Sequence, residues 1–121
     1  MDHTPGFLKL VDEARARVRE IPVSAVRHRI AAGARFFDVR EDDEWAAEHP
    51  AGAEHLGKGV IERDIERTVP DRGAEVLLMC GGGFRSALAA DALQRMGYTN
   101  VWSVEGGWRA WKAEGLPVSS S

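Results

Sequence analysis

Hydrophobic and polar positions along this 121-residue chain follow two patterns, one typical of helices and one typical of strands. In the helical pattern, apolar residues recur at intervals of three and four positions, opposite a charged face. This pattern predicts three longer helices, over residues 7–20, 60–69 and 85–98. The strand pattern is a short and mostly apolar run between turn signals. It predicts strands within residues 34–40, 71–80 and 99–107, and a further short strand is expected at 52–56.

Residues with strong local preferences mark where other elements begin and end. Ile21 precedes a proline, so its backbone should be extended. Ser24 is suited to cap a short helix that Gly33 would close. Gly97 supplies a stop for the long helix before it. Two more short helices are predicted, over residues 41–49 and 107–115.

Strand and helix segments alternate along the chain, and the strand runs are mostly apolar. This order is typical of an α/β fold with a central, mainly parallel sheet covered by helices on both faces. The length suits one compact domain, and no repeat, low-complexity segment or linker divides it. We expect a helical extension over residues 1–20, the domain over 21–118 and a disordered tail over 119–121.

Composition narrows the classes of partner. The net charge of −3 does not favour nucleic acid or a membrane surface, which a basic face would attract. No apolar run is long enough to span a bilayer, and the first 20 residues lack the pattern of a secretory signal. The single cysteine excludes an internal disulfide, a C-x-x-C pair and a cysteine-rich zinc site. We therefore expect a cytoplasmic location and no bound metal or cofactor.

Three polar clusters follow predicted strands, at residues 38–40, 80–85 and 105–108. In open parallel sheets, ligands bind beyond the carboxyl ends of the strands. The three clusters are therefore expected to converge on one mouth of the sheet.

Cys80 ends an apolar run and precedes a helix that is expected to start near Ser86. A thiolate in that place is stabilised by the positive end of the helix dipole. The glycines at 81–83 let the loop curl so that successive N–H groups can surround an anion. Arg85 adds a permanent positive charge. A nucleophilic thiol beside an oxyanion site accounts for all of these features.

Simpler explanations of the same residues exist. A lone cysteine is often a small buried hydrophobe, and three glycines can be only a flexible turn. A glycine-rich turn after a strand can also hold a nucleotide phosphate. However, the spacing fits neither G-x-G-x-x-G nor G-x-x-x-x-G-K-[ST]. Strand, thiol and arginine together favour the nucleophile.

Three motifs resemble those of single-domain rhodaneses, a sulfurtransferase family: "FFDVREDDEW", "CGGGFRS" and "VEGGWRAW". The resemblance covers about residues 21–117 and keeps the order of the family. It implies an α/β fold with a central parallel sheet and a six-residue loop, Cys80–Arg85, that carries sulfur as a cysteine persulfide.

One element departs from the family pattern. In "WAAEHPAGA", Pro50 and Ala51 replace the usual Ile and Pro, so the backbone there is expected to be reshaped. Ala110 stands where the family often has an acidic residue. The match makes His49 structural rather than a catalytic base. The positions of this element that agree with the family are Trp45, His49, Gly52 and Ala53.

The resemblance implies a two-step reaction. Cys80 would take the sulfane sulfur of a donor such as thiosulfate and pass it to cyanide, a thiol or a protein acceptor. Arg85 would hold the oxyanion of the donor. Asp38 and Arg40 would support the loop, with Arg40 a candidate second anion contact, and Ser86 is a further supporting residue. The loop amides that would stabilise the sulfur anion belong to Gly81, Gly82, Gly83, Phe84 and Arg85. A monomer is expected.

Two other functions stay open at this point. Cysteine-dependent phosphatases, to which arsenate reductases are related in chemistry, place five residues between cysteine and arginine, whereas four separate Cys80 from Arg85 here. No acid on a mobile loop can be singled out, and no second cysteine is present for a thiol cascade. The other alternative is a non-catalytic rhodanese-like module that binds a partner or senses sulfane sulfur.

Overall fold

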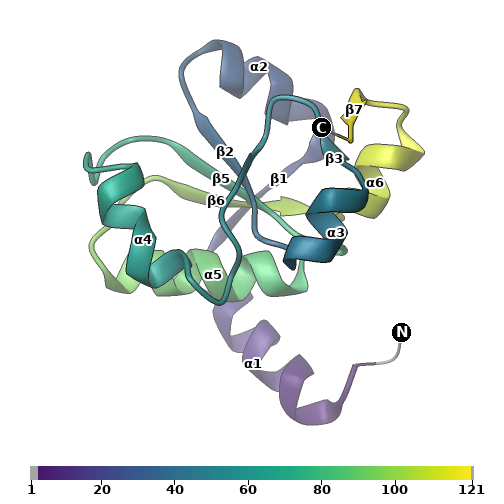
Figure 1. The fold of residues 1–121 in the computed structure, drawn as a ribbon. Coiled ribbons are helices and arrows are strands. Elements are labelled where there is room, and N and C mark those ends of the chain that lie inside the picture. Colours follow the sequence, from purple (N-terminus) through teal and green to yellow (C-terminus); the bar gives the residue numbers. More distant parts are fainter. Residues whose placement is uncertain (1–2, 121) are drawn as a thin grey trace.

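The computed structural model describes residues 3–120, and within them five parallel strands form the central sheet in the order β1-β6-β5-β2-β4 (Figure 1). The strands of this sheet are β1 (Arg19–Pro22), β2 (Arg35–Asp38), β4 (Glu54–His55), β5 (Val76–Met79) and β6 (Val101–Glu105). Two short antiparallel strands, β3 (His49–Pro50) and β7 (Val118–Ser119), pair beside it. The helices are α1 (Pro5–Arg15), α2 (Val26–Ala31), α3 (Asp42–Ala47), α4 (Ile61–Thr68), α5 (Phe84–Arg95) and α6 (Gly107–Ala113).

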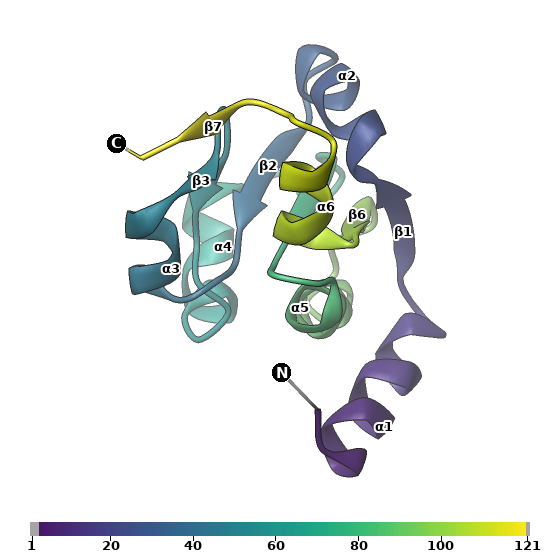
Figure 2. The ribbon, with the colours of Figure 1, turned by 90° about the vertical axis from the view of Figure 1, so that its right-hand side faces the viewer.

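Helices cover both faces of the sheet, which confirms the predicted α/β class. Successive side chains of a strand point to opposite faces. In β2, Phe37 packs into the hydrophobic cluster beneath α4 and α5, whereas Phe36 packs against Trp111 of α6 on the other side. Each fully buried side chain of this size contributes about 2–3 kcal/mol. Helix α1 lies outside the α5 layer (Figure 2).

The helix predicted over residues 7–20 is too long, because α1 ends at Arg15 and β1 begins at Arg19. Pairing with β6 explains the difference. It aligns Arg19 with Trp102 and buries Ile21, which the helical pattern had left on the boundary of the extension. Pairing with a strand that lies 83 residues further along the chain, as in the Arg19–Trp102 pair, outweighs the local helical spacing.

Two further expectations about ends of elements are wrong. Ser24 does not cap a helix, because it lies inside a 3-10 turn (Val23–Ala25) that leads into α2. Ser119, the first residue of the tail that was expected to be disordered, lies in β7 and pairs with His49 of β3. Residue 121 lies outside the described residues. Helix α5 begins at Phe84, slightly earlier than expected, directly after Gly83.

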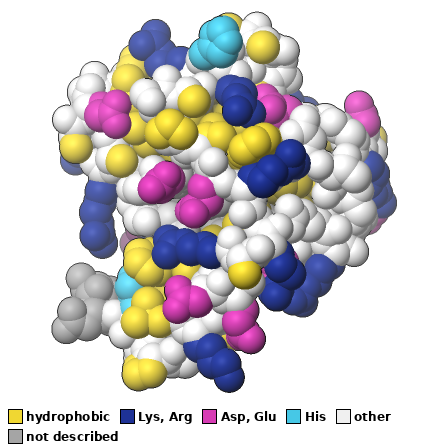
Figure 3. Space-filling view, turned by 180° about the vertical axis from the view of Figure 1, so that it is seen from behind, with side chains coloured by type: hydrophobic (Ala, Val, Ile, Leu, Met, Phe, Trp, Pro, Cys, Tyr) yellow, Lys and Arg dark blue, Asp and Glu magenta, His cyan; other side chains and the backbone are white. Residues whose placement is uncertain are grey.

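The surface carries charges of both signs. Lys, Arg, Asp and Glu side chains are interspersed over the face shown in Figure 3. The α1 helix exposes some apolar residues, with Leu10 57% exposed. Within residues 3–120, no helix has the length and apolar character needed to cross a membrane.

Candidate active site

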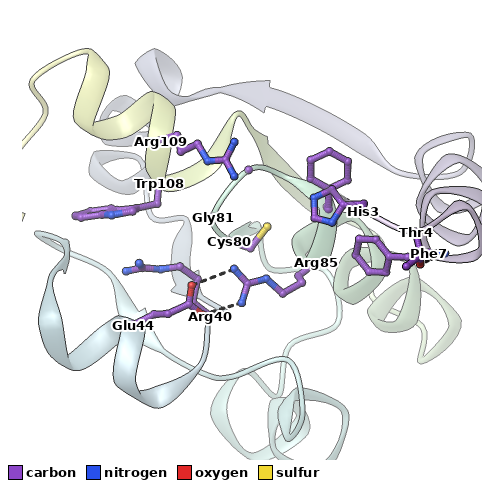
Figure 4. A pocket seen from close by; sticks show the side chains of 12 residues that line it. His3, Thr4, Phe7, Arg40, Glu44, Cys80, Gly81, Arg85, Trp108 and Arg109 are labelled. Atoms are coloured by element: carbon purple, nitrogen blue, oxygen red, sulfur yellow. Dashed lines mark hydrogen bonds and ion pairs between the residues drawn. The ribbon is translucent and has the colours of Figure 1, made fainter. Parts of the chain in front are cut away.

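One pocket, of about 780 Å³, lies where β2 and β5 end and α6 begins (Figure 4). Cys80 follows β5, Arg40 lies two residues beyond β2, and Trp108 belongs to the first turn of α6. Residues from the three predicted polar clusters therefore meet at one edge of the sheet, as parallel strands require. Glu105, which ends β6, is exposed and does not line this pocket.

Cys80 is almost completely buried at the centre of the pocket (Figure 4). Its Sγ accepts the N–H of Gly83 at 3.1 Å and lies 3.5 Å from the hydroxyl of Ser86, which is 2.7 Å from the hydroxyl of Ser103. Gly83 has a φ of 93°, a conformation that glycine adopts without strain. The sulfur therefore lies at the positive end of α5, beside a donated N–H, and both stabilise a thiolate.

The first turn of α6 holds the cysteine loop from outside. The N–H of Trp108 donates to the carbonyl of Cys80 at 2.7 Å, and the N–H of Arg109 donates to that of Gly81 at 3.1 Å. This approach needs a glycine at 107, because a Cβ there would lie 2.3 Å from the Cys80 carbonyl oxygen. The motif "VEGGWRAW" thus acts by fixing the backbone of the loop.

Arg85 is engaged by Glu44 across the pocket (Figure 4). Its Nη1 and Nη2 donate to the two carboxylate oxygens of Glu44 at 2.7 and 3.3 Å. This hydrogen bonding lowers the pKa of Glu44 and raises the pKa of Arg85, so both stay charged. Glu44 also accepts the N–H of Glu41 in the capping box of α3. The charge of Arg85, which was expected to hold the oxyanion of the donor, is therefore largely balanced by Glu44.

Arg40 is balanced in the same way by Asp38. The pair is buried, with an Nη2–Oδ2 distance of 2.9 Å, and the Arg40 Nη2 also donates to the carbonyl of Glu48 at 2.7 Å. The Arg40 guanidinium lies 4.7 Å from the centre of a ring of Trp108. Asp38 therefore fixes Arg40 at the rim of the pocket, while Arg40 itself lines it.

His49 has the contacts of a packed residue. Its ring stacks on the ring of Trp45 with 3.5 Å between the ring centroids, and its Nδ1 lies 2.8 Å from the Trp45 carbonyl oxygen. His55 bonds through Nε2 to the carbonyl of Arg40. Over residues 3–120, no group of three or more His, Cys, Asp or Glu side chains is placed to hold a metal ion.

Several pocket residues were not found from the sequence. Glu44 looked like one of many acids in a helical turn, and no local signal marks its pairing with α5. Arg109 looked like an ordinary helix residue, although it directly follows a motif tryptophan. Its guanidinium has no hydrogen-bond or ion-pair partner among the residues described. His3 and Phe7 belong to the expected N-terminal extension, yet both line the pocket.

A parallel sheet with a cysteine loop between a central strand and its following helix defines the class of protein. Residues 23–114 match the model of the rhodanese-like domain, and the chain belongs to this family. A curated relative, thiosulfate sulfurtransferase GlpE of Actinobacillus pleuropneumoniae serotype 7, is 33% identical over 89 residues, which cover 74% of this chain and 81% of that protein.

Two solved structures are similar over nearly the whole chain. The polysulfide-sulfur transferase homodimer of Wolinella succinogenes has a TM-score of 0.80 at 26% identity, covering 94% of this chain and 87% of that one. A Rhodopseudomonas palustris protein of unknown function, described as a possible tyrosine phosphatase, has a TM-score of 0.79 at 26% identity, covering 98% of each chain.

Proposed function

We propose that this protein is a sulfurtransferase that carries sulfane sulfur as a persulfide on Cys80. The observation that carries the proposal is the position of the Cys80 sulfur, at the start of α5 and 3.1 Å from the N–H of Gly83. A sulfur anion is stabilised there without a metal or a separate base. The family and the sulfurtransferase relatives support the same class of reaction.

In the first step, the Cys80 thiolate attacks the outer sulfur of thiosulfate. A bond forms between Sγ and that sulfur while the sulfur–sulfur bond of thiosulfate breaks, and its electron pair leaves with sulfite. The product is a Cys80 persulfide anion, which the Gly83 N–H and the dipole of α5 stabilise as they did the thiolate.

In the second step, a nucleophile takes the outer sulfur and restores the thiolate. Cyanide gives thiocyanate, and a thiolate gives a persulfide of the acceptor. A cysteine of a partner protein would accept the sulfur by the same attack. Covalent catalysis divides one transfer into two displacements in this way. Because the thiol must stay reduced between turnovers, we place the protein in a reducing compartment such as the cytoplasm.

Arg109 is the residue to which we assign the oxyanion of the donor. Arg40 and Arg85 also line the pocket, but each already has a carboxylate partner. The guanidinium of Arg109 has none among residues 3–120, and its α6 backbone is bonded to the cysteine loop. An unpaired guanidinium offers a planar set of donors to sulfonate oxygens.

Phosphatase activity is a second candidate, favoured by the similarity to the Rhodopseudomonas protein described as a possible tyrosine phosphatase. The length of the cysteine loop argues against phosphatase activity. Four residues separate Cys80 from Arg85, one fewer than in cysteine-dependent phosphatases, so fewer amides can surround a phosphate. The charge that would bind phosphate is also offset by Glu44.

Intact-mass measurement after incubation with thiosulfate tests the proposal. We expect the mass of one sulfur atom to be gained, lost again with cyanide, and never gained by Cys80→Ser. The chain has no other cysteine, so the adduct has one possible thiol site. Hydrolysis of an aryl phosphate without sulfur loading would establish the phosphatase instead. A protein with neither activity would be a binding or sensing module instead.

A further inference from the structure

One wall of the pocket is formed by three aromatic rings, two from the start of the chain and one from the first residue of α5. The His3 ring lies 4.3 Å from the Phe84 ring between centroids, the Phe7 ring lies 6.3 Å from it, and His3 and Phe7 are 5.1 Å apart. All three rings line the pocket and are partly exposed to it. We call His3, Phe7 and Phe84 the aromatic wall. Two of its three members lie outside the region 23–114 that matches the family.

The aromatic wall has a fixed place because α1 is fastened to the rest of the protein. Val11 and Ala14 of α1 are fully buried, and α1 packs along α5. Arg15, at the end of α1, donates to the carbonyl of Gly83 at 3.3 Å and lies over the Phe84 ring at 4.7 Å. The N-terminal helix is therefore bonded to the cysteine loop itself.

The pocket is larger and more apolar than thiosulfate requires. Thiosulfate has five heavy atoms and two charges, whereas a volume of about 780 Å³ is in the range of sites for organic ligands. In Figure 4, Phe7 and His3 stand on one side of Cys80, and Arg109 stands on another. A ligand that uses the whole pocket has an apolar group that faces His3 and Phe7, an anionic group that faces Arg109 and a reactive sulfur that reaches Cys80.

We propose that the aromatic wall is a specificity determinant for organic thiosulfonates, R–SO₂–S⁻, in which R is a flat apolar group. The proposal rests on the sulfurtransferase function proposed above. In this class one sulfur atom carries the apolar group and the two oxygens, so R can lie on the aromatic wall while the oxygens face Arg109. Stacked and edge-to-face ring contacts then favour an aromatic R.

The transfer step balances as it does with thiosulfate. The Cys80 thiolate attacks the terminal sulfur, the bond from Sγ to that sulfur forms, and the bond to the sulfonyl sulfur breaks. The electron pair leaves with the sulfinate, R–SO₂⁻. No oxidant, reductant or proton is needed, because a thiolate and a thiosulfonate anion become a persulfide anion and a sulfinate anion.

The test compares benzenethiosulfonate with methanethiosulfonate, since these two donors differ only in R. For each, kcat/KM is measured with cyanide as acceptor, and the ratio of the two values reports the contribution of R. We expect Phe7→Ala to lower this ratio about tenfold. Phe7→Leu, which keeps apolar bulk, should lower it less. Leu8→Ala is the matched control, because Leu8 is the neighbouring apolar residue of α1 and does not line the pocket.

The outcomes separate the two proposals. Sulfur loading of Cys80 by both donors, with a ratio that Phe7→Ala does not change, overturns the role of the aromatic wall and leaves the sulfurtransferase intact. An equal change in Leu8→Ala overturns it too, since the effect would then come from α1 as a whole. Failure of both donors to load Cys80 overturns the proposed function. Thermal unfolding shows whether each variant is folded, and Phe7→Leu supplies the result if Phe7→Ala is not.

Discussion

Replacing Glu44 with glutamine should make thiosulfate a better donor while slightly destabilising the fold. The carboxylate of Glu44 holds both Nη atoms of Arg85, so its removal frees a guanidinium inside the pocket. Glutamine keeps the side-chain oxygen that accepts the N–H of Glu41, and it is a normal residue at this position of a capping box. The substitution therefore changes the charge of the pocket more than the structure of α3.

The size of the effect follows from Coulomb's law. A unit charge and a dianion at about 8 Å, in an effective dielectric constant of about 40, interact by about 2 kcal/mol. Screening over one Debye length reduces this to about 0.8 kcal/mol at physiological salt, which corresponds to about a fourfold rise in kcat/KM for thiosulfate. The Arg85 and Glu44 side chains are 30% and 35% exposed, so the lost pair should cost under about 1 kcal/mol of unfolding free energy.

Thiocyanate formation at fixed cyanide measures the first quantity, and urea unfolding measures the second. The gain should be larger at about 0.01 M ionic strength than at about 0.15 M, because the Debye length is then about 30 Å rather than 8 Å. Asp43→Asn is the matched control, since it removes the same charge from an exposed position of α3 that does not line the pocket. An unchanged or lower kcat/KM in Glu44→Gln, or an equal gain in Asp43→Asn, would refute the reasoning.

Four further predictions concern Arg109, Gly107, Asp38 and the pH dependence of the Glu44–Arg85 pair. Arg109→Gln should lower kcat/KM for thiosulfate about tenfold in the thiocyanate assay, with partial recovery in Arg109→Lys; an unchanged value would show that another group binds the donor. Gly107→Ala should lower the unfolding free energy by about 2–4 kcal/mol in urea, because its Cβ would meet the Cys80 carbonyl; a neutral result would contradict the close approach. Asp38→Asn should cost about 3 kcal/mol in the same measurement, since it leaves a buried guanidinium without its partner, and a loss below 1 kcal/mol would argue against that burial. The hydrogen bond from Arg85 lowers the pKa of Glu44, so the stability that this pair provides is complete above the ordinary pKa of 4.5 and is lost as the pH falls through the lowered pKa. Plots of unfolding free energy against pH for wild type and Glu44→Gln should therefore converge below pH 4.5. Parallel plots would contradict the shift.

Local patterns predicted most of the fold because most of its elements are locally encoded. The apolar run before Cys80 and the helical spacing after it are visible in the sequence, and parallel strands necessarily bring their carboxyl ends together. The secondary structure at the start of the chain was harder to predict. Residues 17–20 have acceptable helical spacing, and only the pairing with β6, which comes about 80 residues later, makes Arg19–Pro22 a strand.

The site was predictable in the same uneven way. Cys80 and its glycines form a continuous motif, so their place at the start of a helix could be read directly. The pairing of charges in the pocket could not be read from the sequence. Glu44 and Arg85 are 41 residues apart and meet only through the fold. Their pairing is the reason why the proposed function assigns the donor anion to a different arginine. A positive residue in a motif shows where charge is present, but its partners decide whether that charge is available.

In the proposed function, the distribution of the pocket residues separates the residues of the sulfur transfer from those that select the donor. The nucleophile, its N–H donor and the α6 residues that hold the loop all lie within residues 23–114, the region that this chain shares with its family. His3 and Phe7 lie outside that region and contact the loop through Phe84, while Arg15 bonds to the Gly83 carbonyl. On this proposal, changes in residues 3–15 would alter which donors fit without changing the atoms that transfer sulfur. The same helix cannot be lost without consequence for the loop, because the carbonyl that Arg15 holds belongs to the residue whose N–H binds the sulfur.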